Sequence, residues 1–353
     1  MRIGFLTSTP LDVVKGSGTF VGLSTLAAAL RRMGVEVEIV APGFRFPIYT
    51  ARRWWFNHQL SRRRWDGFDL LVGFDMDGYR IAGRTGRPQV ASIKGVIADE
   101  LRLERGITRL TMSMQAAWEA EHVRRADLVM TTSSYAAHRM QELYRSPKLP
   151  RVVPEPIDLA AWRDLLARNP AAPQSGKFTV LTVCRFYPRK RLHLLLAAAG
   201  RLRHEIPALE FRIVGDGPER GRLDALWREM HLQYTVRWLG DLSPDDLARE
   251  YNRCDVFCLP SVQEGFGIVF LEAMAAGKPI VAANAAAVPE VVPQGLLVEP
   301  ENGAALVEGL RRIHGDAALR ARLAEAGKAV VERYDAASVA ALFLSEVRGL
   351  VNG

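Results

Sequence analysis

The chain has 353 residues, of which 48% are hydrophobic and 24% are charged, and its formal net charge is +8. This length exceeds one ordinary domain and suits two, each with its own core. No apolar run approaches the roughly 20 residues that cross a bilayer as a helix, so the composition argues against an integral membrane protein. The positive charge indicates an anionic partner, and a nucleotide, a nucleic acid and a membrane surface all fit that description.

The first half of the chain predicts alternating strands and helices. The opening MRIGFLTSTP predicts a strand rather than a signal peptide, so a cytoplasmic location is expected. Further strands are expected at VEVEIVAP, DLLVGF, PQVASI and ADLVMTTS, and helices at Ser24–Met33 and Met114–Arg125. Such alternation is typical of βαβ units and parallel sheets.

A proline-rich stretch interrupts this pattern. It predicts a linker at residues 161–176, between an N-terminal domain at 1–160 and a C-terminal domain at 177–335. Strands resume at FTVLTVCRF, LEFRIVGDG, YTVRWLG, CDVFCLP, KPIVAAN and GLLVEP, and the tail, 336–353, predicts a helix that packs back on the first domain. We therefore expect an α/β protein of two Rossmann-like, doubly wound domains. Because ligands bind beyond the carboxyl ends of the strands in such sheets, a substrate cleft between the domains is expected.

The three cysteines do not indicate a disulfide framework or a metal site. Cys184, Cys254 and Cys258 lie in or beside apolar, strand-like runs. We expect them to be buried structural thiols.

The segment 254–292 carries the strongest indication of chemistry. A strand runs into the loop 261–267, and a helix is expected to open at about Gly267. Gly265 and Gly267 let the backbone approach a ligand closely. The free N–H groups of the first helical turn, around Ile268, form an anion site that suits a diphosphate. Glu264 and Glu272 flank this site, and the alternative is that they are a helix-capping acid and a solvated one.

The same segment resembles a known family. Glu264 and Glu272, with seven residues between them and with EGFG and EAMAAGKP around them, closely resemble the E-x7-E signature of family 4 retaining glycosyltransferases. That family has the GT-B fold. The stretches VCRFYPRKRLHLLL, IVGDGPERGRL and WLGDLSPDDLAREYNRCDVFCLPS follow the family order, and the resemblance is weaker in the first half.

The resemblance implies roles for particular residues. Arg185 and Lys190 would bind the donor diphosphate, and a positive pair at the end of a strand also suits a phosphate on physical grounds. The alternative for this pair is a surface basic cluster with Arg189 and Arg191. Glu264, with the backbone of Phe266 and Gly267, would hold the transferred sugar. Glu272 would accept hydrogen bonds from the ribose, and the turn at Gly215 would lie near the nucleoside.

A second glycine pair lies in the first half, in KGSGTFVGLSTLAAAL. Gly16 and Gly18 are expected to precede a helix and are similar to the family's glycine-rich loop, close to the donor phosphates or the acceptor. The predicted catalytic set is Glu264, Arg185, Lys190 and Lys94. The predicted donor-binding set is Gly16, Gly18, Arg185, Lys190, Gly215, Glu264, Gly265, Phe266, Gly267, Ile268 and Glu272.

Three positions depart from the family pattern. Lys94-Gly95 stands where a histidine followed by glycine is common, so Lys94 is expected to replace it as a cation toward the sugar or the phosphate. Glu155-Pro156 stands where Asn-Gly is usual, and Ala286-Ala287 where a glycine pair often precedes Pro-Glu. These departures leave a binding protein without turnover as one alternative.

Two further patterns allow more than one interpretation. Asp75-Met76-Asp77 looks like a metal-binding D-x-D, but an aspartate facing the cleft is the preferred interpretation. The segment 50–65, TARRWWFNHQLSRRRW, carries five arginines and four aromatic residues. It predicts either contact with an anionic membrane or a helix that buries Trp54, Trp55 and Trp65; nucleic acid is not expected.

The sequence as a whole predicts a retaining, metal-independent glycosyltransferase. Its co-substrate is expected to be a UDP- or GDP-sugar, with no other cofactor and no metal. The acceptor is unidentified; a lipid-linked acceptor, another glycan and a small molecule all stay open. An epimerase or phosphorylase on the same fold is the alternative enzyme, and a peripheral position at the inner membrane face is the alternative location.

Overall fold

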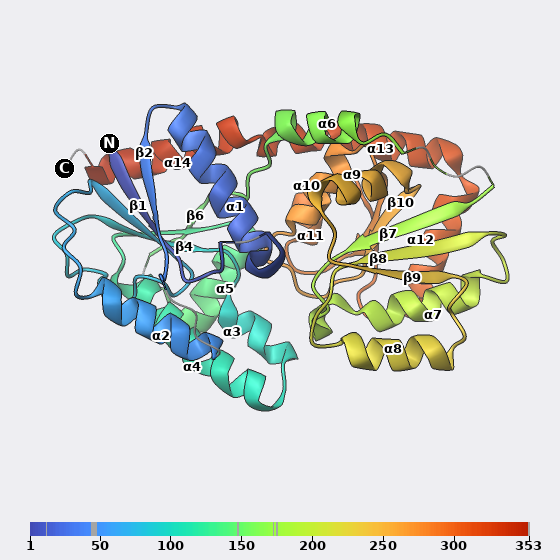
Figure 1. Cartoon of the computed structure of the whole chain (residues 1–353), viewed down its shortest axis with the longest axis horizontal. Coiled ribbons are helices and arrows are strands. Elements are labelled where there is room, and N and C mark those ends of the chain that lie inside the picture. The colour runs from blue at the N-terminus through green and yellow to red at the C-terminus, as the bar shows by residue number, and fades with distance from the viewer. Residues whose placement is uncertain (12, 44–47, 147, 172, 174–175, 352–353) are drawn as a thin grey trace. The chain divides into compact units, whose positions relative to one another are not determined.

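A computed structural model gives the fold of the chain (Figure 1). It describes residues 1–11, 13–43, 48–146, 148–171, 173 and 176–351, and for residues 13–17 the backbone alone. The chain divides into two units. Unit 1 comprises Met1–Pro156 and Ala336–Gly353, and unit 2 comprises Ile157–Asp335.

Unit 1 is a parallel sheet covered by helices. The strands occur in the order β2-β1-β3-β4-β5-β6, and every pairing is parallel. Its elements are β1 (Arg2–Leu6), α1 (Val13–Arg32), β2 (Glu36–Val40), α2 (Tyr49–Leu60), β3 (Leu70–Phe74), β4 (Gln89–Ile93), α3 (Ile97–Glu100), η1 (Leu101–Leu103), α4 (Gly106–Arg125), β5 (Leu128–Thr131), α5 (Ser134–Tyr144), β6 (Arg151–Val152) and α14 (Ala336–Val351).

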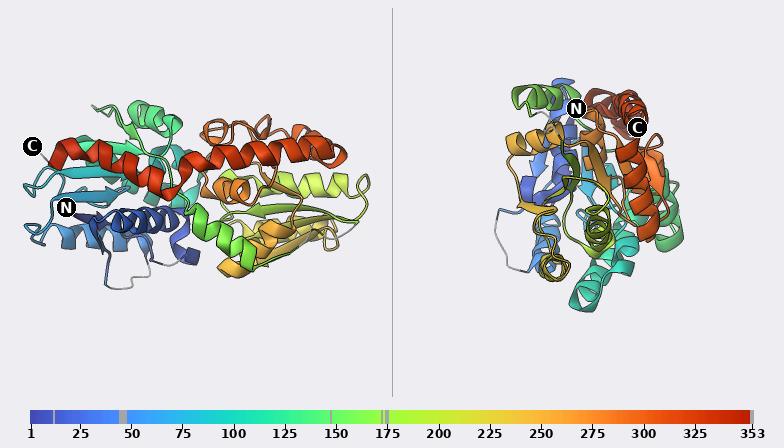
Figure 2. Two further views of the ribbon diagram at one scale, coloured as in Figure 1. Left: turned by 90° about the horizontal axis from the view of Figure 1, so that it is seen from above. Right: turned by 90° about the vertical axis from the view of Figure 1, so that its right-hand side faces the viewer.

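Side chains at alternate positions of the unit 1 strands point to opposite faces of the sheet, because a β-strand is pleated. Ile3 and Phe5 of β1 pack with α1 and α14, whereas Leu6 packs with Phe56 of α2. Helix α14 supplies Val339, Phe343 and Val347 to the first of these clusters, although it follows unit 2 in the sequence. Figure 2 shows the same segment from two further directions. The C-terminal helix is therefore part of the core of unit 1.

Unit 2 has a second parallel sheet, in the order β12-β11-β10-β7-β8-β9. Its elements are α6 (Leu159–Arg168), β7 (Phe178–Val183), η2 (Pro188–Lys190), α7 (Leu192–Leu202), β8 (Leu209–Val214), α8 (Arg220–Glu229), β9 (Val236–Gly240), α9 (Pro244–Arg253), β10 (Val256–Leu259), α10 (Ile268–Ala275), β11 (Ile280–Ala283), α11 (Val288–Val291), β12 (Leu296–Val298), α12 (Gly303–Gly315), α13 (Ala317–Val331) and η3 (Glu332–Tyr334).

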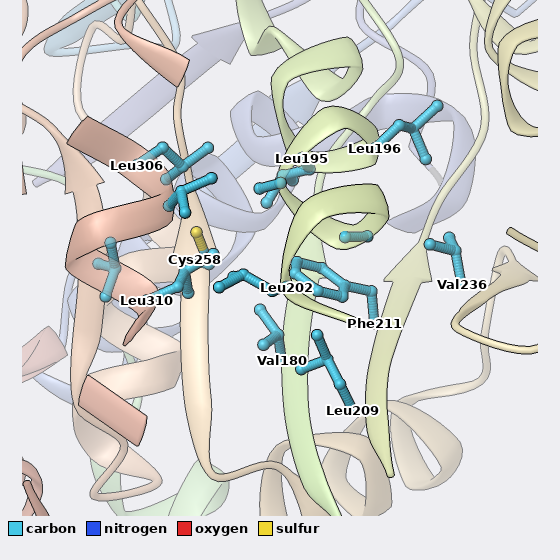
Figure 3. Packing of buried hydrophobic residues seen from close by; sticks show 14 of the residues in the cluster. Val180, Leu195, Leu196, Leu202, Leu209, Phe211, Val236, Cys258, Leu306 and Leu310 are labelled. Carbon is cyan, nitrogen blue, oxygen red and sulfur yellow. The ribbon is translucent and has the colours of Figure 1, made fainter. Parts of the chain in front are cut away.

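One face of the unit 2 sheet is covered by α7 and α12. Leu195 and Leu202 of α7 and Leu310 of α12 pack on strand residues that include Val180 and Phe211 (Figure 3). The other face is covered by α6, α9 and α10. Both units thus have helices on both faces of a parallel sheet, which is the doubly wound architecture expected from the sequence.

Several boundaries differ from the sequence-based expectations. Helix α6, Leu159–Arg168, occupies part of the expected linker at 161–176, and Leu159 and Leu166 are buried in unit 2. The signal was weak because the helix is short and proline-flanked. Strand β6, two residues long, was not expected. Cys254 and Cys258 are buried as expected, whereas Cys184 is only partly buried.

Candidate functional site

The carboxyl ends of β7 and β10 form the candidate site of unit 2. These two strands are neighbours at the point where the strand order of the sheet reverses, which is where doubly wound folds bind ligands. Lys190 ends the short helix η2 after β7, and Glu264 lies in the loop after β10. The Lys190 Nζ donates to Glu264 Oε1 at 2.5 Å, and the two residues are only 8% and 7% exposed. The fold therefore brings together two predicted site residues that are 74 positions apart.

The loop 260–267 leads directly into helix α10. Gly267 precedes the helix with φ 93°, and a Cβ there would lie 2.7 Å from the Phe270 ring. Only glycine fits this conformation and this space. The Val262 N–H donates to the Arg189 carbonyl at 2.9 Å, which ties the loop to the segment that carries Lys190. The loop that carries Glu264 is thus tied to the segment that carries Lys190, and it leads into the start of α10, where helix N–H groups suit an anion.

Several side chains of this loop and of the first turn of α10 are buried but differ in their contacts. The Phe266 ring is buried and packs edge-on against Tyr334 at 5.4 Å, so its backbone is the part left for a ligand. Ile268 is 8% exposed and belongs to the buried face of α10. The Ser261 hydroxyl is fully buried, and no described residue is its hydrogen-bond partner. Sequence reasoning did not single out Ser261, because a serine before a helix is common.

Arg185 lies on the other side of β7. Its guanidinium is 3.8 Å from Asp241, which follows β9, and both side chains are more than a third exposed. The turn after β8 packs tightly behind it: Gly215 has φ 109°, and a Cβ there would lie 2.1 Å from the Cys184 carbonyl oxygen. Arg185 and Gly215 therefore lie on adjacent strand ends. Asp241 was not anticipated, because nothing in the sequence indicates its pairing.

Glu272 lies inside α10, and its carboxylate accepts a hydrogen bond from the Tyr251 hydroxyl at 2.8 Å. Burial raises the pKa of Glu272 to about 7, against the opposing effect of the Tyr251 hydrogen bond. The Trp162 indole N–H donates to the backbone carbonyl of the same residue at 3.1 Å. Tyr251 was missed as a neighbour of Glu272, since the two are 21 positions apart. The expected contact of Glu272 with a ribose stays a prediction.

The loop after β11 contacts the Glu264 loop. The Ala287 N–H donates to the Glu264 carbonyl at 3.2 Å. Ala286, where a glycine is common in the family pattern, has φ 52°. This left-handed conformation is strained for a residue with a Cβ. The backbone conformation that glycine favours is thus kept although the glycine is replaced.

The predicted site residues of unit 1 form a separate group. Lys94 follows β4, and its backbone N–H donates to Asp75 at 2.9 Å. The Lys94 ammonium donates to Glu155 Oε2 at 3.0 Å, and the two side chains are 6% and 5% exposed. Two of the departures from the family pattern are therefore in direct contact.

The Asp75-Met76-Asp77 motif has a structural role at Asp77. Asp77 is fully buried and accepts hydrogen bonds from Ser8 and from Asn57, and Arg53 lies 3.8 Å away. Burial raises the pKa of Asp77, and Arg53 opposes this. The Asp77 oxygens are thus bound by neighbouring residues of unit 1, and the expectation that an aspartate of this motif faces the cleft stays a prediction. No group of three or more candidate metal ligands occurs within the described residues.

Two expectations for unit 1 need correction. Gly16 and Gly18 lie within α1, which begins at Val13, and not before the helix. In the segment 50–65, Phe56 and Trp65 are buried, whereas Trp54 and Trp55 are 39% and 44% exposed. The expected burial of Trp54 and Trp55 is therefore wrong. Arg53 is also buried, with its nearest acidic neighbour, Asp75, at 3.7 Å.

Comparisons with known proteins agree with this architecture. Residues 16–161 match the family described as Glycosyltransferase Family 4, and residues 166–330 match Glycosyl transferases group 1. Phosphatidyl-myo-inositol mannosyltransferase of Mycobacterium tuberculosis is 35% identical over 203 residues, which are 53% of this chain and 51% of that protein. The chain spans between 30% and 51% of the length of the curated relatives compared.

Solved structures show the same fold over nearly the whole chain. Sucrose-phosphate synthase from Thermosynechococcus elongatus matches with a TM-score of 0.84 and 22% identity, covering 99% of each chain. The Anabaena protein HepE, solved with UDP-glucose, matches with a TM-score of 0.71 and 20% identity, covering 99% of this chain and 100% of that one. Residues 16–161 and 166–330 are thus similar to two families of glycosyltransferases, and the chain has the GT-B fold.

Proposed function

We propose that the chain is a retaining glycosyltransferase that moves a sugar from a nucleotide-diphosphate-sugar to a hydroxyl acceptor and needs no metal. The observation that carries this proposal is the buried Lys190–Glu264 pair beside the start of α10, at the β7–β10 switch point. An ammonium has three N–H donors, and Glu264 uses one of them among the described residues. The remaining donors suit phosphate oxygens.

The chemistry follows from these positions. Lys190, Arg185 and the N–H groups of α10 would stabilise the negative charge that develops on the leaving diphosphate. The Glu264 carboxylate would accept hydrogen bonds from hydroxyl groups of the transferred sugar. The backbone N–H groups of Gly265, Phe266 and Gly267 would donate hydrogen bonds to it. Because Glu264 is already paired with Lys190, it suits positioning better than nucleophilic attack. This supports front-face transfer, in which the leaving phosphate takes the acceptor proton and the anomeric configuration is retained.

The nature of the donor is part of the proposal. The fold shared with HepE, which was solved with UDP-glucose, supports a UDP-sugar, and a GDP-sugar is the second choice. No other cofactor is proposed. A panel of UDP-, GDP- and ADP-sugars in a thermal unfolding assay tests this, because a ligand at about 100 times its Kd stabilises the folded state by about 2.7 kcal/mol.

The site is tested by two substitutions. Lys190→Met and Glu264→Gln should each lower the rate of sugar transfer by about 10²-fold to 10³-fold, as loss of one transition-state contact does. Lys278→Met is the matched control, because the Lys278 ammonium donates to the Asn252 and Cys254 carbonyls before β10 and lies outside the proposed site. It should keep the transfer rate. Full activity of Lys190→Met or Glu264→Gln would refute the site.

The alternatives differ in their products. With a donor and no acceptor, an epimerase changes the nucleotide sugar itself, whereas a transferase releases nucleoside diphosphate only slowly to water. A phosphorylase needs added phosphate. Donor binding without any product over a long incubation would instead support a binding protein without turnover.

We also propose a peripheral contact with anionic membrane lipids through unit 1. Trp54, Trp55 and Ile48 are exposed around α2, and Ile107, Leu110 and Met114 form an exposed stripe on α4. No helix among the described residues is long and apolar enough to cross a bilayer. Arginines border both surfaces, and the segment 105–118 has no acidic residue. The name of the mannosyltransferase relative, which mentions a phosphatidyl lipid, is consistent with a lipid acceptor.

Vesicle sedimentation tests the membrane contact. The chain should sediment with vesicles of phosphatidylserine and phosphatidylcholine and not with phosphatidylcholine alone, and salt should weaken the binding. Replacement of Trp54 and Trp55 by alanine should reduce it. Tyr234→Ala is the control, since Tyr234 is a 91% exposed aromatic residue of unit 2. Equal binding to both kinds of vesicle would contradict the proposal.

A further inference from the structure

The Lys94–Glu155 pair lies at the carboxyl ends of three strands of unit 1. Lys94 directly follows β4, Glu155 follows β6 by three positions, and Asp75, which binds the Lys94 N–H, follows β3. The pair is almost completely buried. Burying two charges is costly, so a pair in this place calls for an explanation beyond stability.

The Lys94 ammonium keeps unused hydrogen-bonding capacity. Among the described residues it donates one hydrogen bond, to Glu155, and its nitrogen lies 5.6 Å from the centre of the Phe74 ring. An ammonium has three N–H donors. This buried ammonium has two remaining donors and lies at the carboxyl ends of the strands, where ligands bind in such folds. It is therefore suited to donate hydrogen bonds to oxygen atoms of a ligand.

Helix α1 is shaped to admit the Glu155 carboxylate. A Cβ on Gly22 would lie 2.0 Å from Glu155 Oε2, the oxygen that accepts from Lys94. Any larger residue at position 22 must therefore displace this oxygen. Since the displaced atom is the end of a flexible side chain, the helix itself need not move. Gly22 thus permits the contact between Glu155 and Lys94.

Charge indicates which ligand suits the pair. The Glu155 carboxylate offsets the charge of the Lys94 ammonium at 3.0 Å, and Asp75 adds a second carboxylate nearby. Burial raises the pKa of Glu155, and Lys94 opposes this. A phosphate would meet these carboxylates as well as the cation. A neutral hydroxyl group accepts a hydrogen bond from the ammonium without that repulsion.

We propose that Gly22, Glu155 and Lys94 form one positioning unit, in which Glu155 aims the Lys94 ammonium at a neutral hydroxyl group of a substrate. This inference rests on the proposed glycosyl transfer and names a substrate-positioning arrangement in unit 1. Lys94 is the residue that touches the substrate, and Glu155 and Gly22 act through it. The lysine and the glutamate are then interdependent, so neither can be replaced alone without loss.

A double-mutant cycle tests the coupling without any activity assay. Lys94→Met and Glu155→Leu should each lower the midpoint of urea unfolding, because each leaves one buried charge unpaired. The double variant removes both charges of the pair and should recover most of that loss. Additive effects of the two substitutions would overturn the coupled pair, whatever the enzyme transfers.

Kinetics test the positioning role. Turnover is measured as nucleoside diphosphate release from whichever of UDP-glucose, GDP-mannose and ADP-glucose the unmodified chain uses. The double variant should fold and bind this donor normally yet turn over about 10²-fold more slowly, as expected for a misplaced reacting group. Normal turnover in a stable double variant would show that the pair is only structural. Lack of turnover in the unmodified chain would instead contradict the proposed function, and the stability cycle would still judge the pair.

Gly22→Ala tests the contact between Lys94 and Glu155 by a substitution in helix α1. It should lower turnover as Glu155→Gln does, with donor binding unchanged, although alanine favours a helix over glycine. Gly349→Ala is the matched control, because position 349 lies in α14 of the same unit and nothing is within 4 Å of its Cβ. Equal turnover of the two glycine variants would overturn the role of Gly22.

Inorganic phosphate is the probe for charge. Phosphate should stabilise the Glu155→Gln variant against heat more than it stabilises the unmodified chain, since the variant exposes an uncompensated ammonium to it. Glu250→Gln is the control, because Glu250 is a buried carboxylate that is paired with Arg212 in unit 2. Equal stabilisation of Glu155→Gln and the unmodified chain would overturn the preference for a neutral hydroxyl.

Discussion

At the scale of single residues, burial and hydrogen bonding oppose each other at Glu272. Burial raises its pKa to about 7, while the hydrogen bond from Tyr251 favours the ionised form. The folded chain therefore holds a proton on Glu272 over a pH range in which the unfolded chain has lost it. Stability contributed by this group is present at low pH and falls as the pH rises from the unfolded pKa, 4.5, to the folded value, about 7.

This predicts a pH-dependent effect of Glu272→Gln. At about pH 8 the variant should be more stable than the unmodified chain by up to about 3 kcal/mol, and at about pH 4 the two should be equal. Urea unfolding at both pH values measures this. Glu229→Gln, on an exposed position of α8, controls for loss of charge alone. A stability difference that does not change with pH would contradict the prediction.

Ala286 shows strain at another single position. Its φ of 52° is one that glycine adopts without cost, so Ala286→Gly should raise the stability of unit 2 by about 1 kcal/mol. Ala285→Gly, at the preceding position, should instead lower stability by about 0.5–1 kcal/mol, because glycine there only adds freedom to the unfolded chain. Thermal unfolding of both variants measures the contrast. Destabilisation by Ala286→Gly would mean that the turn does not carry strain.

At the scale of elements, α14 shows how a segment distant in sequence completes a core. Phe343 is 2% exposed and packs edge-on against Phe5 of β1, with the ring centres 6.3 Å apart. Leu342, the preceding residue, is 37% exposed. The helix therefore buries one face on unit 1, and adjacent positions differ sharply in their environment.

Phe343→Ala should destabilise unit 1 by about 3–5 kcal/mol, through lost burial and the cavity left behind. Leu342→Ala should change stability by less than about 0.5 kcal/mol, as exposed substitutions usually do. Calorimetry can separate the two units if they unfold independently, and the transition of unit 2 should then stay in place. An equal effect of the two substitutions would show that α14 does not complete the core.

At the scale of the whole molecule, the charges proposed to act on the diphosphate come from the chain itself. Lys190, Arg185 and the start of α10 supply them in unit 2. In unit 1, the carboxylates that looked like a metal-binding motif lie beside Arg53, at 3.7 Å from Asp75 and 3.8 Å from Asp77. In the proposed reaction, these side chains would supply the charge stabilisation that a bound divalent cation can otherwise provide.

Removal of divalent cations tests whether protein groups alone stabilise the charge of the diphosphate. Dialysis against EDTA should leave the rate of sugar transfer unchanged within about twofold, since charge stabilisation is supplied by fixed groups. Addition of Mg²⁺ or Mn²⁺ should then have no further effect. Loss of transfer with EDTA and recovery with either cation would contradict metal independence.

The sequence by itself determined the fold class, because the alternation of apolar strands with amphipathic helices is a local signal. It also singled out Lys190 and Glu264, which the structure brings into contact. Only the tertiary structure showed that Lys94 donates a hydrogen bond to Glu155 and that Gly22 leaves space for this contact. It also showed that Asp77 accepts hydrogen bonds from Ser8 and Asn57. These contacts join residues on separate elements, and their partners are set by how the strands are ordered and how the helices pack, which no local pattern specifies.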